Sequence, residues 1–331
     1  MRFLYKYITI LFVCTSCATD IEILDPLADQ PVIYCLLNQE SSTQYLRLSR
    51  SYLSYTGQNV PESADSLVYF SQVEAQLELL EEGEVVETFA FEPHEVIKDT
   101  GQFPRDPHWV YKTEHQVKPN HTYRLVVYIV DTDKILYSEC KTLSEFKILD
   151  PIHPDVRTIH ILPDHDPVFR WTSATNAILY QLGFILHFKE IYSDSIVSRS
   201  LQIPIRSSFQ DGKAVGHYSY PINSTQFYIK IAEQLEEDPG VQRKFTSLDV
   251  QVQAGGEDLA YYIQQLQNAD PFRIFEFNNL MNSVGVFSAF SLEKVEGFQL
   301  TAQCIDSLAY GRFTKKLNFL DRYGNRKDKR P

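Results

Sequence analysis

The sequence predicts a mainly β protein made of two β-sandwich domains of the immunoglobulin or fibronectin type III kind. Apolar and polar residues alternate with a period of two in many segments after Pro31, as they do over residues 73–79. Turn signals such as Pro119 followed by Asn120 separate short strand-like runs. A chain of 331 residues also exceeds the length of one ordinary domain.

The first residues, 1–16, predict a lipoprotein signal peptide. A positive flank, an apolar run over residues 7–13 and two small residues precede Cys17. The apolar run is much shorter than the roughly 20 residues of a membrane-spanning helix. We therefore expect cleavage before Cys17 and lipid on that residue, although Cys14 stands where the usual lipoprotein pattern has leucine. An ordinary secretory signal followed by a chance cysteine is the alternative.

The charge of the chain bears on the kind of partner it can have. Its formal net charge is −12, and removal of a basic signal peptide makes the mature chain more acidic still. Nucleic-acid binding requires a basic surface, and so does adsorption to anionic lipid. We expect no nucleic-acid partner, and attachment to the outer membrane through lipid rather than through protein charge, with the face of that membrane left open.

The predicted N-terminal sandwich covers residues 31–149, after a lipidated cysteine and acidic tether at residues 17–30. Tyr123 opens one strand just after a turn, where a tyrosine corner is expected. The strands expected in this domain lie at residues 45–50, 73–79, 85–91, 108–117, 122–130 and 135–143.

A proline-rich stretch at residues 150–154 predicts a linker to a fibronectin III-like domain over residues 150–321. The nearly all-apolar run at residues 178–188 predicts a central strand covered on both faces. The helical stripe of Leu259, Ile263 and Leu266 predicts an inserted helix near residues 258–267. Further strands are expected at residues 168–171, 196–205, 226–231, 248–254, 284–292 and 297–303, and a basic flexible tail at residues 322–331.

Two segments carry a resemblance to a known family. After the Cys17 pattern and the acidic tether, the strand VIYCLLNQESSTQYLRLSRSY (residues 32–52) and the late FNNLMNSVGVFSAFSL (residues 277–292) resemble the Bacteroidota outer-membrane lipoprotein family labelled domain of unknown function four-two-four-nine. Such proteins tend to be encoded beside TonB-dependent outer-membrane receptors. The resemblance implies a role in uptake or receptor assembly, and it brings no catalytic residues.

Motifs for catalysis, cofactors and metals were sought along the whole chain. No G-x-S-x-G, phosphate-binding loop or H-E-x-x-H sequence occurs, and we expect no catalytic residues and no cofactor. The best metal candidate joins His160, Asp164, His165 and Asp166, but a polar loop between two strands explains it better, so no metal is expected. Acidic runs at residues 81–84 and 236–238 are most simply solvated turns.

Aromatic and thiol side chains leave two further questions. The tyrosine-rich segment at residues 52–57 and the aromatic residues at 261–275 are candidate stacking platforms for a sugar or peptide, although core packing explains them more simply. Cys35, Cys140 and Cys304 lie in apolar or strand-like segments and are expected to be buried thiols. A disulfide between Cys35 and Cys140 stays open in an oxidising compartment.

The sequence therefore favours a non-enzymatic, lipid-anchored cell-envelope protein that binds a TonB-dependent receptor. The first alternative is a surface adhesin or glycan-binding module, which exposed Tyr and Trp side chains in a concave patch would favour. The second is a hydrolase with dispersed carboxylates, which would need two converging acidic groups in a cleft.

Overall fold

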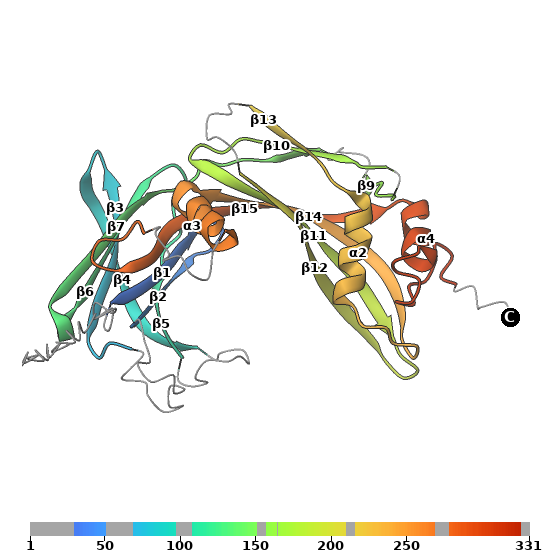
Figure 1. Cartoon of the computed structure of the whole chain (residues 1–331), viewed down its shortest axis with the longest axis horizontal. Coiled ribbons are helices and arrows are strands. Elements are labelled where there is room, and N and C mark those ends of the chain that lie inside the picture. The colour runs from blue at the N-terminus through green and yellow to red at the C-terminus, as the bar shows by residue number, and fades with distance from the viewer. Residues whose placement is uncertain are drawn as a thin grey trace, which may run out of the picture.

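The computed structural model describes residues 30–50, 69–96, 108–150, 157–163, 165–209, 216–268 and 278–325, and it confirms a mainly β protein (Figure 1). The first strands are β1 (Pro31–Asn38), β2 (Thr43–Arg50), β3 (Val73–Glu81), β4 (Glu84–Val96), β5 (His108–Glu114), β6 (Thr122–Ile129) and β7 (Lys134–Lys141). They are followed by β8 (Ile148–Asp150), β9 (Thr158–Ile159), β10 (Val168–Thr172), β11 (Ala177–Ile191), β12 (Ile196–Phe209), β13 (His217–Pro221), β14 (Gln242–Gly256) and β15 (Val284–Leu300). The helices are the 3-10 turn η1 (Val130–Thr132), α2 (Ser224–Gln234), α3 (Glu257–Gln267) and α4 (Ala302–Tyr310).

Among these residues, one large mixed sheet of 12 strands runs through the molecule. Its order is β12-β11-β14-β15-β1-β2-β5-β4-β3-β6-β7, with β9 beside β15, and β13-β10-β8 form a second, small sheet. Figure 1 shows β1 to β7 gathered at one end of the molecule and β8 to β14 at the other. We call these the N-terminal unit and the C-terminal unit.

The long strand β15 joins the two units. Its first part, from Val284 to Phe290, runs parallel to β1, and its later residues, from Phe290 to Phe298, pair with β14. Gly285 has a φ of +124° at the start of this strand, in a region that residues other than glycine rarely adopt. Because β15 pairs with both β1 and β14, the sheet continues from one unit into the other.

The N-terminal unit has its own hydrophobic core. Alternate residues of β1, β2, β3 and β6 point into it, as the period of two requires. Leu280, Phe287 and Ala289 also belong to this core, although the sequence placed them in the second domain. The core is thus completed by residues from the far end of the chain.

Tyr123 forms the corner expected from the sequence. Its ring is fully buried, and its hydroxyl accepts a hydrogen bond of 3.0 Å from the backbone N–H of Lys118. The Nε2 atom of His115 lies 2.9 Å from the same hydroxyl. These contacts satisfy the one polar atom of a large apolar side chain, which would otherwise be costly to bury.

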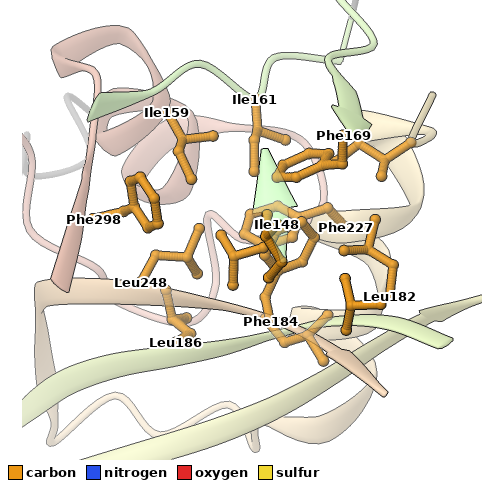
Figure 2. Packing of buried hydrophobic residues seen from close by; sticks show 14 of the residues in the cluster. Ile148, Ile159, Ile161, Phe169, Leu182, Phe184, Leu186, Phe227, Leu248 and Phe298 are labelled. Carbon is orange, nitrogen blue, oxygen red and sulfur yellow. The ribbon is translucent and has the colours of Figure 1, made fainter. Parts of the chain in front are cut away.

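The core of the C-terminal unit packs the inner face of β11 and β14 against the small sheet and helix α2. In Figure 2 Phe184 and Leu186 point toward Phe227 and Ile148, with Ile159, Ile161, Phe169 and Phe298 around them. Strand β11 lies between β12 and β14 and is buried along most of its length, which confirms the predicted central strand. This unit repeats the tyrosine contact, because the Tyr180 hydroxyl accepts a hydrogen bond of 2.7 Å from the Ala174 N–H.

One predicted helix is confirmed, and the secondary structure differs from the expectation in two other places. The predicted helix near residues 258–267 is confirmed as α3. The strand predicted at residues 226–231 is wrong, because this segment forms α2, whose first turn is capped by the Asn223 side chain accepting from Gln226 N. The two late strands predicted at residues 284–292 and 297–303 are one continuous strand, which ends at Leu300 before α4 begins.

No helix in the described ranges has both the length and the apolar character that a membrane span requires.

Candidate functional site

Several residues singled out in the sequence fall outside the described residues. Cys17, the predicted site of lipidation, is among them, with the signal peptide, nearly all of the tether and most of the basic tail. The others are Tyr52, Tyr55, Gly57, Asp164, Phe272 and Phe275.

A hollow of about 480 Å³ opens at one end of the N-terminal unit. We call it the aromatic hollow. Its lining residues come from β2, β4, β5 and the segments before β3 and after β6: Arg50, Tyr69, Phe70, Ser71, Pro93, Trp109, Tyr111 and Asp131.

The polar groups of the aromatic hollow are held in place. The Arg50 guanidinium lies 4.4 Å from the centroid of the Phe70 ring, a cation–π arrangement, and its Nη2 atom is 3.8 Å from Asp131 Oδ2. Asp131 accepts hydrogen bonds from the Ser71 hydroxyl (2.7 Å) and the Ser71 N–H (2.8 Å), which, with the Arg50 charge, lower the pKa of this carboxyl. The hollow therefore offers fixed charges beside aromatic surface, with little rearrangement needed on binding.

The aromatic hollow lies at the end of the sheet where the chain enters its first strand. The Cα atoms of Pro31 and Arg50 are direct partners in the β1–β2 ladder. Val96 pairs with His108 at the same end of β4 and β5, next to Trp109. The hollow is thus adjacent to Pro31, the first residue of β1.

A second hollow, of about 440 Å³, lies on the other face of the C-terminal sheet from the core. We call it the polar hollow. It is lined by β11, β12, β14 and β15 through His187, Phe188, Lys189, Ser198, Arg199, Thr246, Ser247, Asp249, Lys294, Glu296 and Gly297.

Asp249 is the centre of the polar hollow, and it is only 3% exposed. His187 Nε2 lies 2.8 Å from its Oδ2 atom, Lys294 Nζ lies 3.1 Å from the same oxygen, and Gly297 N–H donates to Oδ1 over 3.0 Å. Burial acts to raise the pKa of Asp249, but these hydrogen bonds outweigh it, so the pKa lies below its ordinary value. The carboxylate is therefore charged and fully engaged by the protein.

The Asp249–His187 pair resembles the base of a catalytic triad, in which the histidine also bonds to a serine nucleophile. Two serines lie close enough in the sheet to be compared with that arrangement. Ser200 and Ser247 are the cross-strand partners of His187 on β12 and β14. Within the described residues neither hydroxyl is hydrogen-bonded to His187, whose side chain bonds to Asp249 instead. The described geometry supplies an Asp–His pair without a nucleophile in line with it.

The described residues of the metal candidate, His160, His165 and Asp166, make contacts within the protein. The His160 and His165 rings lie edge to face with centroids 5.2 Å apart, and His160 Nδ1 is 3.0 Å from the Thr301 hydroxyl. Asp166 Oδ1 accepts from the N–H of Ser224 at the start of α2. In the part of the chain that the structure describes, no three His, Cys, Asp or Glu side chains are grouped to hold a metal ion.

The two tyrosines of α3 differ in their surroundings. Tyr262 meets the Tyr34 ring of β1 edge-on, with centroids 6.0 Å apart, while Tyr261 is 45% exposed. The acidic runs are turns, as expected. Glu82 has a φ of 51° in the β3–β4 turn, and Asp238 Oδ1 accepts from Gly240 N–H.

Cys35, Cys140 and Cys304 are buried free thiols in this structure, in agreement with the simpler expectation. Burial raises the pKa of Cys35 to about 12 and that of Cys140 well above its ordinary value. Cys304 Sγ accepts the N–H of Ile161 (3.1 Å) and lies 2.9 Å from the Thr301 hydroxyl. The raised pKa of Cys35 and Cys140 disfavours the thiolate, which is the reactive form.

Comparisons with known proteins add little to this geometry. No protein-family model and no curated protein matches the chain. Among solved structures, the C-terminal globular domain of an oligosaccharyltransferase from Pyrococcus abyssi aligns with 82% of this chain at 11% identity and a TM-score of 0.21. The aligned part spans 48% of that structure, and a similarity this low carries no argument about fold or function.

Sequence reasoning identified neither hollow. The residues that line the aromatic hollow come from separate segments of the chain. In the sequence, Trp109 and Tyr111 indicated only alternate positions of a predicted strand. The one available signal was Trp109 itself, one of two tryptophans in the chain. The other, Trp171, is 1% exposed in the C-terminal core, whereas Trp109 is 36% exposed.

Proposed function

We propose that this protein is a non-enzymatic component of the cell envelope, anchored to the outer membrane by lipid on Cys17, that binds a TonB-dependent receptor in the same membrane. The observation that carries the binding role is the aromatic hollow beside the start of β1. The anchor and the identity of the receptor rest on the amino-terminal pattern and the family resemblance.

The composition of the aromatic hollow suits a protein partner. Trp, Tyr and Arg are the residues most enriched among those that dominate binding energy at protein interfaces. Here Trp109, Tyr111 and Arg50 line one concave surface. Because Arg50 is already held against Phe70 and Asp131, a partner side chain entering the hollow would meet prearranged groups.

The charged groups elsewhere favour binding over chemistry. In the polar hollow the charge of Asp249 is engaged by His187, Lys294 and Gly297. The buried Glu190 is likewise paired, with Arg243 and Arg199. A general acid or base must exchange protons with a substrate, and these carboxylates are held as charged structural groups instead.

The same proposal extends to the finer architecture, as two β-sandwich domains of the immunoglobulin or fibronectin III kind. Each unit has a separate hydrophobic core. Each also has a tyrosine, Tyr123 or Tyr180, whose hydroxyl accepts from a backbone N–H a few residues upstream.

Affinity capture from native outer membranes tests the proposal. The full chain carrying a C-terminal tag is cross-linked in intact cells, and the recovered proteins are identified by mass spectrometry. We expect a TonB-dependent receptor with the wild type, its loss with Trp109→Ala, and its retention with Tyr45→Ala, an exposed aromatic residue outside the hollow. If the protein is abundant and intact and no outer-membrane barrel is recovered with it, the proposed binding to a receptor is wrong.

A glycan-binding role is the second candidate, and the same hollow favours it. Exposed tryptophan and tyrosine rings stack on sugar rings, and Trp109 and Tyr69 lie here beside the charged groups of Asp131 and Arg50. A glycan array separates the two roles. Specific hits that disappear with Trp109→Ala favour glycan binding. An array without hits favours receptor binding instead.

A further inference from the structure

We propose that the end of the N-terminal unit around the aromatic hollow rests on the lipid surface, so that the C-terminal unit projects away from the membrane. We call this end the anchor end. The inference rests on the proposed lipidation of Cys17 and goes beyond it, because lipid on that residue would by itself leave the orientation of the protein free.

Strand pairing defines the anchor end. Pro31 lies beside Arg50 in the β1–β2 ladder, and Val32 beside Val284 in the β1–β15 ladder. Across the other layer, Ile129 pairs with both Val73 and Lys134. The beginnings of β1, β3, β7 and β15 and the ends of β2 and β6 therefore meet at one end.

The opposite end of this unit meets the C-terminal unit. There Gln39, just after β1, exchanges two hydrogen bonds with the backbone of Leu143, at the start of the connection to β8. The side chain of Asn176, in the turn before β11, donates to the carbonyl oxygen of Thr142. The anchor end is thus the one that points away from the rest of the molecule (Figure 1).

The length of the tether keeps the anchor end near the membrane. Residues 18–30 connect Cys17 to β1, and a fully extended chain of this length reaches about 45 Å. This reach is an upper limit that holds for any conformation of these residues. The first strand therefore starts close to the bilayer, whichever way the protein is turned.

Exposed apolar side chains gathered at the anchor end support the orientation. At the anchor end Ile135 is 56% exposed, Met281 49%, Tyr137 41% and Val130 38%, and Trp109 stands at the rim of the aromatic hollow. Ile135, Tyr137 and Met281 are adjacent, because Tyr137 and Met281 are bridged through their backbones and Asn282 donates to the carbonyl oxygen of Ile135. Trp and Tyr favour the headgroup region of a bilayer, where aliphatic side chains next to them bury apolar area.

Charge at the anchor end supports contact through apolar groups rather than through electrostatic attraction. Arg50 faces Asp131, and Lys134 follows Asp133, whose carboxylate accepts from the Tyr128 hydroxyl. These opposite charges offset one another, so the described residues of this end form no basic patch that would seek anionic lipid. A lipid surface is therefore the occupant of the apolar groups outside the hollow, Ile135, Tyr137 and Met281, and of the rim at Trp109, while the inside of the hollow faces a receptor in the same membrane.

Tryptophan fluorescence in membranes tests the orientation. The full lipidated chain is reconstituted into vesicles of zwitterionic lipid brominated near the headgroup, which quenches tryptophan at short range. The chain contains Trp109 at the anchor end and Trp171 in the C-terminal core. We expect brominated lipid to lower the emission of Trp109 relative to the same lipid without bromine, because a ring at the headgroup level lies within quenching range.

The controls separate orientation from anchoring. Trp109→Phe leaves only Trp171, whose emission should not change with brominated lipid. Ile135→Ser combined with Met281→Ser should reduce the quenching of Trp109, whereas Ile196→Ser, a comparably exposed apolar residue on the distant β12, should not.

The outcomes discriminate between the two proposals. Protein that stays in the membrane fraction but shows no quenching of Trp109, or shows quenching of Trp171, overturns the orientation and leaves the anchor intact. If neither the wild type nor the Cys17→Ser variant associates with the membrane, the proposed anchor itself is overturned.

Discussion

Gly285 of β15 lies so close to Ile33 of β1 that a Cβ atom at position 285 would stand 1.9 Å from the Ile33 carbonyl oxygen. No real Cβ contact is that short, and the φ of +124° adds backbone strain for any residue except glycine. The two causes act at the start of the parallel ladder between β15 and β1, at the anchor end of the N-terminal unit.

Gly285→Ala should therefore lower the free energy of unfolding by more than about 3 kcal/mol, since strain and a steric clash add. Urea unfolding followed by circular dichroism measures the loss. Gly83→Ala is the matched control, because Gly83 has a φ of +89° but nothing within 4 Å of a Cβ atom. A smaller loss at Gly285 than at Gly83 would contradict the clash.

Tyr123→Phe should lower the free energy of unfolding by about 1–3 kcal/mol, because it leaves the part-buried N–H of Lys118 without its acceptor. Thermal unfolding of the purified protein shows the effect as a lower midpoint. Tyr45→Phe removes a hydroxyl from a side chain that is 50% exposed and should leave the midpoint unchanged. Equal shifts for the two variants would mean that the Tyr123 contact contributes nothing.

Asp249 should make the free energy of unfolding depend on pH in the acidic range. Its pKa in the folded protein lies below its ordinary value of 3.8, so the carboxylate stabilises the fold above that value and ceases to do so as the pH falls through the folded pKa. Asp249→Asn should cost about 1–3 kcal/mol at neutral pH and show a smaller further loss below about pH 4.

Midpoints of urea unfolding, measured between about pH 3 and pH 7, compare the wild type with Asp249→Asn. This range includes the ordinary pKa of an aspartate carboxyl. Asp194→Asn, an exposed turn residue, serves as the control and should follow the wild-type curve. The interpretation fails if the Asp249 variant keeps the full acid dependence of the wild type.

The thiols give a prediction about oxidation. If Cys35, Cys140 and Cys304 are free, the native mature protein should resist alkylation, and the unfolded, unreduced protein should take up one alkyl group at each of the three residues. Intact-mass spectrometry counts the additions. Uptake at Cys304 alone before reduction would show a Cys35–Cys140 disulfide.

Cys17→Ser tests the anchor most directly. We expect the variant either to leave the membrane fraction or to accumulate with its signal peptide still attached, since serine cannot carry the thioether lipid. Cell fractionation with an intact-mass measurement distinguishes these forms. Membrane retention of the Cys17→Ser variant after normal processing speaks against a lipid anchor, and Cys304→Ser provides a cysteine control distant from the amino terminus.

The strands were largely predictable because their signal is local. Alternation with a period of two located most of the strands, and the apolar run that became β11 was correctly assigned to the centre of a sheet. Tyr123 was also recognisable, because a tyrosine corner needs only a turn and a strand start in sequence. The helix α3 was found because its stripe extends over several turns.

Short apolar segments gave the wrong element for a physical reason. Residues 226–231 contain Phe227, Tyr228 and Ile231, which suit a strand by composition and a helix by spacing, and a window of this length does not separate the two periods. The capping residue Asn223 was the distinguishing signal. Alternation in β15 likewise gave no sign that one strand would serve two cores, because its partners β1 and β14 are remote in sequence.

Shared use of β15 also constrains the order in which the chain can fold. Ser291 donates a hydrogen bond to Glu40, 251 residues away along the chain, and Phe287 fills a core whose other members nearly all precede residue 141. If the chain is exported as proposed, the N-terminal unit emerges first but stays incomplete until the last strand has crossed the membrane. Contacts of such long range slow folding and leave a strand edge uncovered in the meantime, so the exported protein would need a chaperone to hold its first half during translocation.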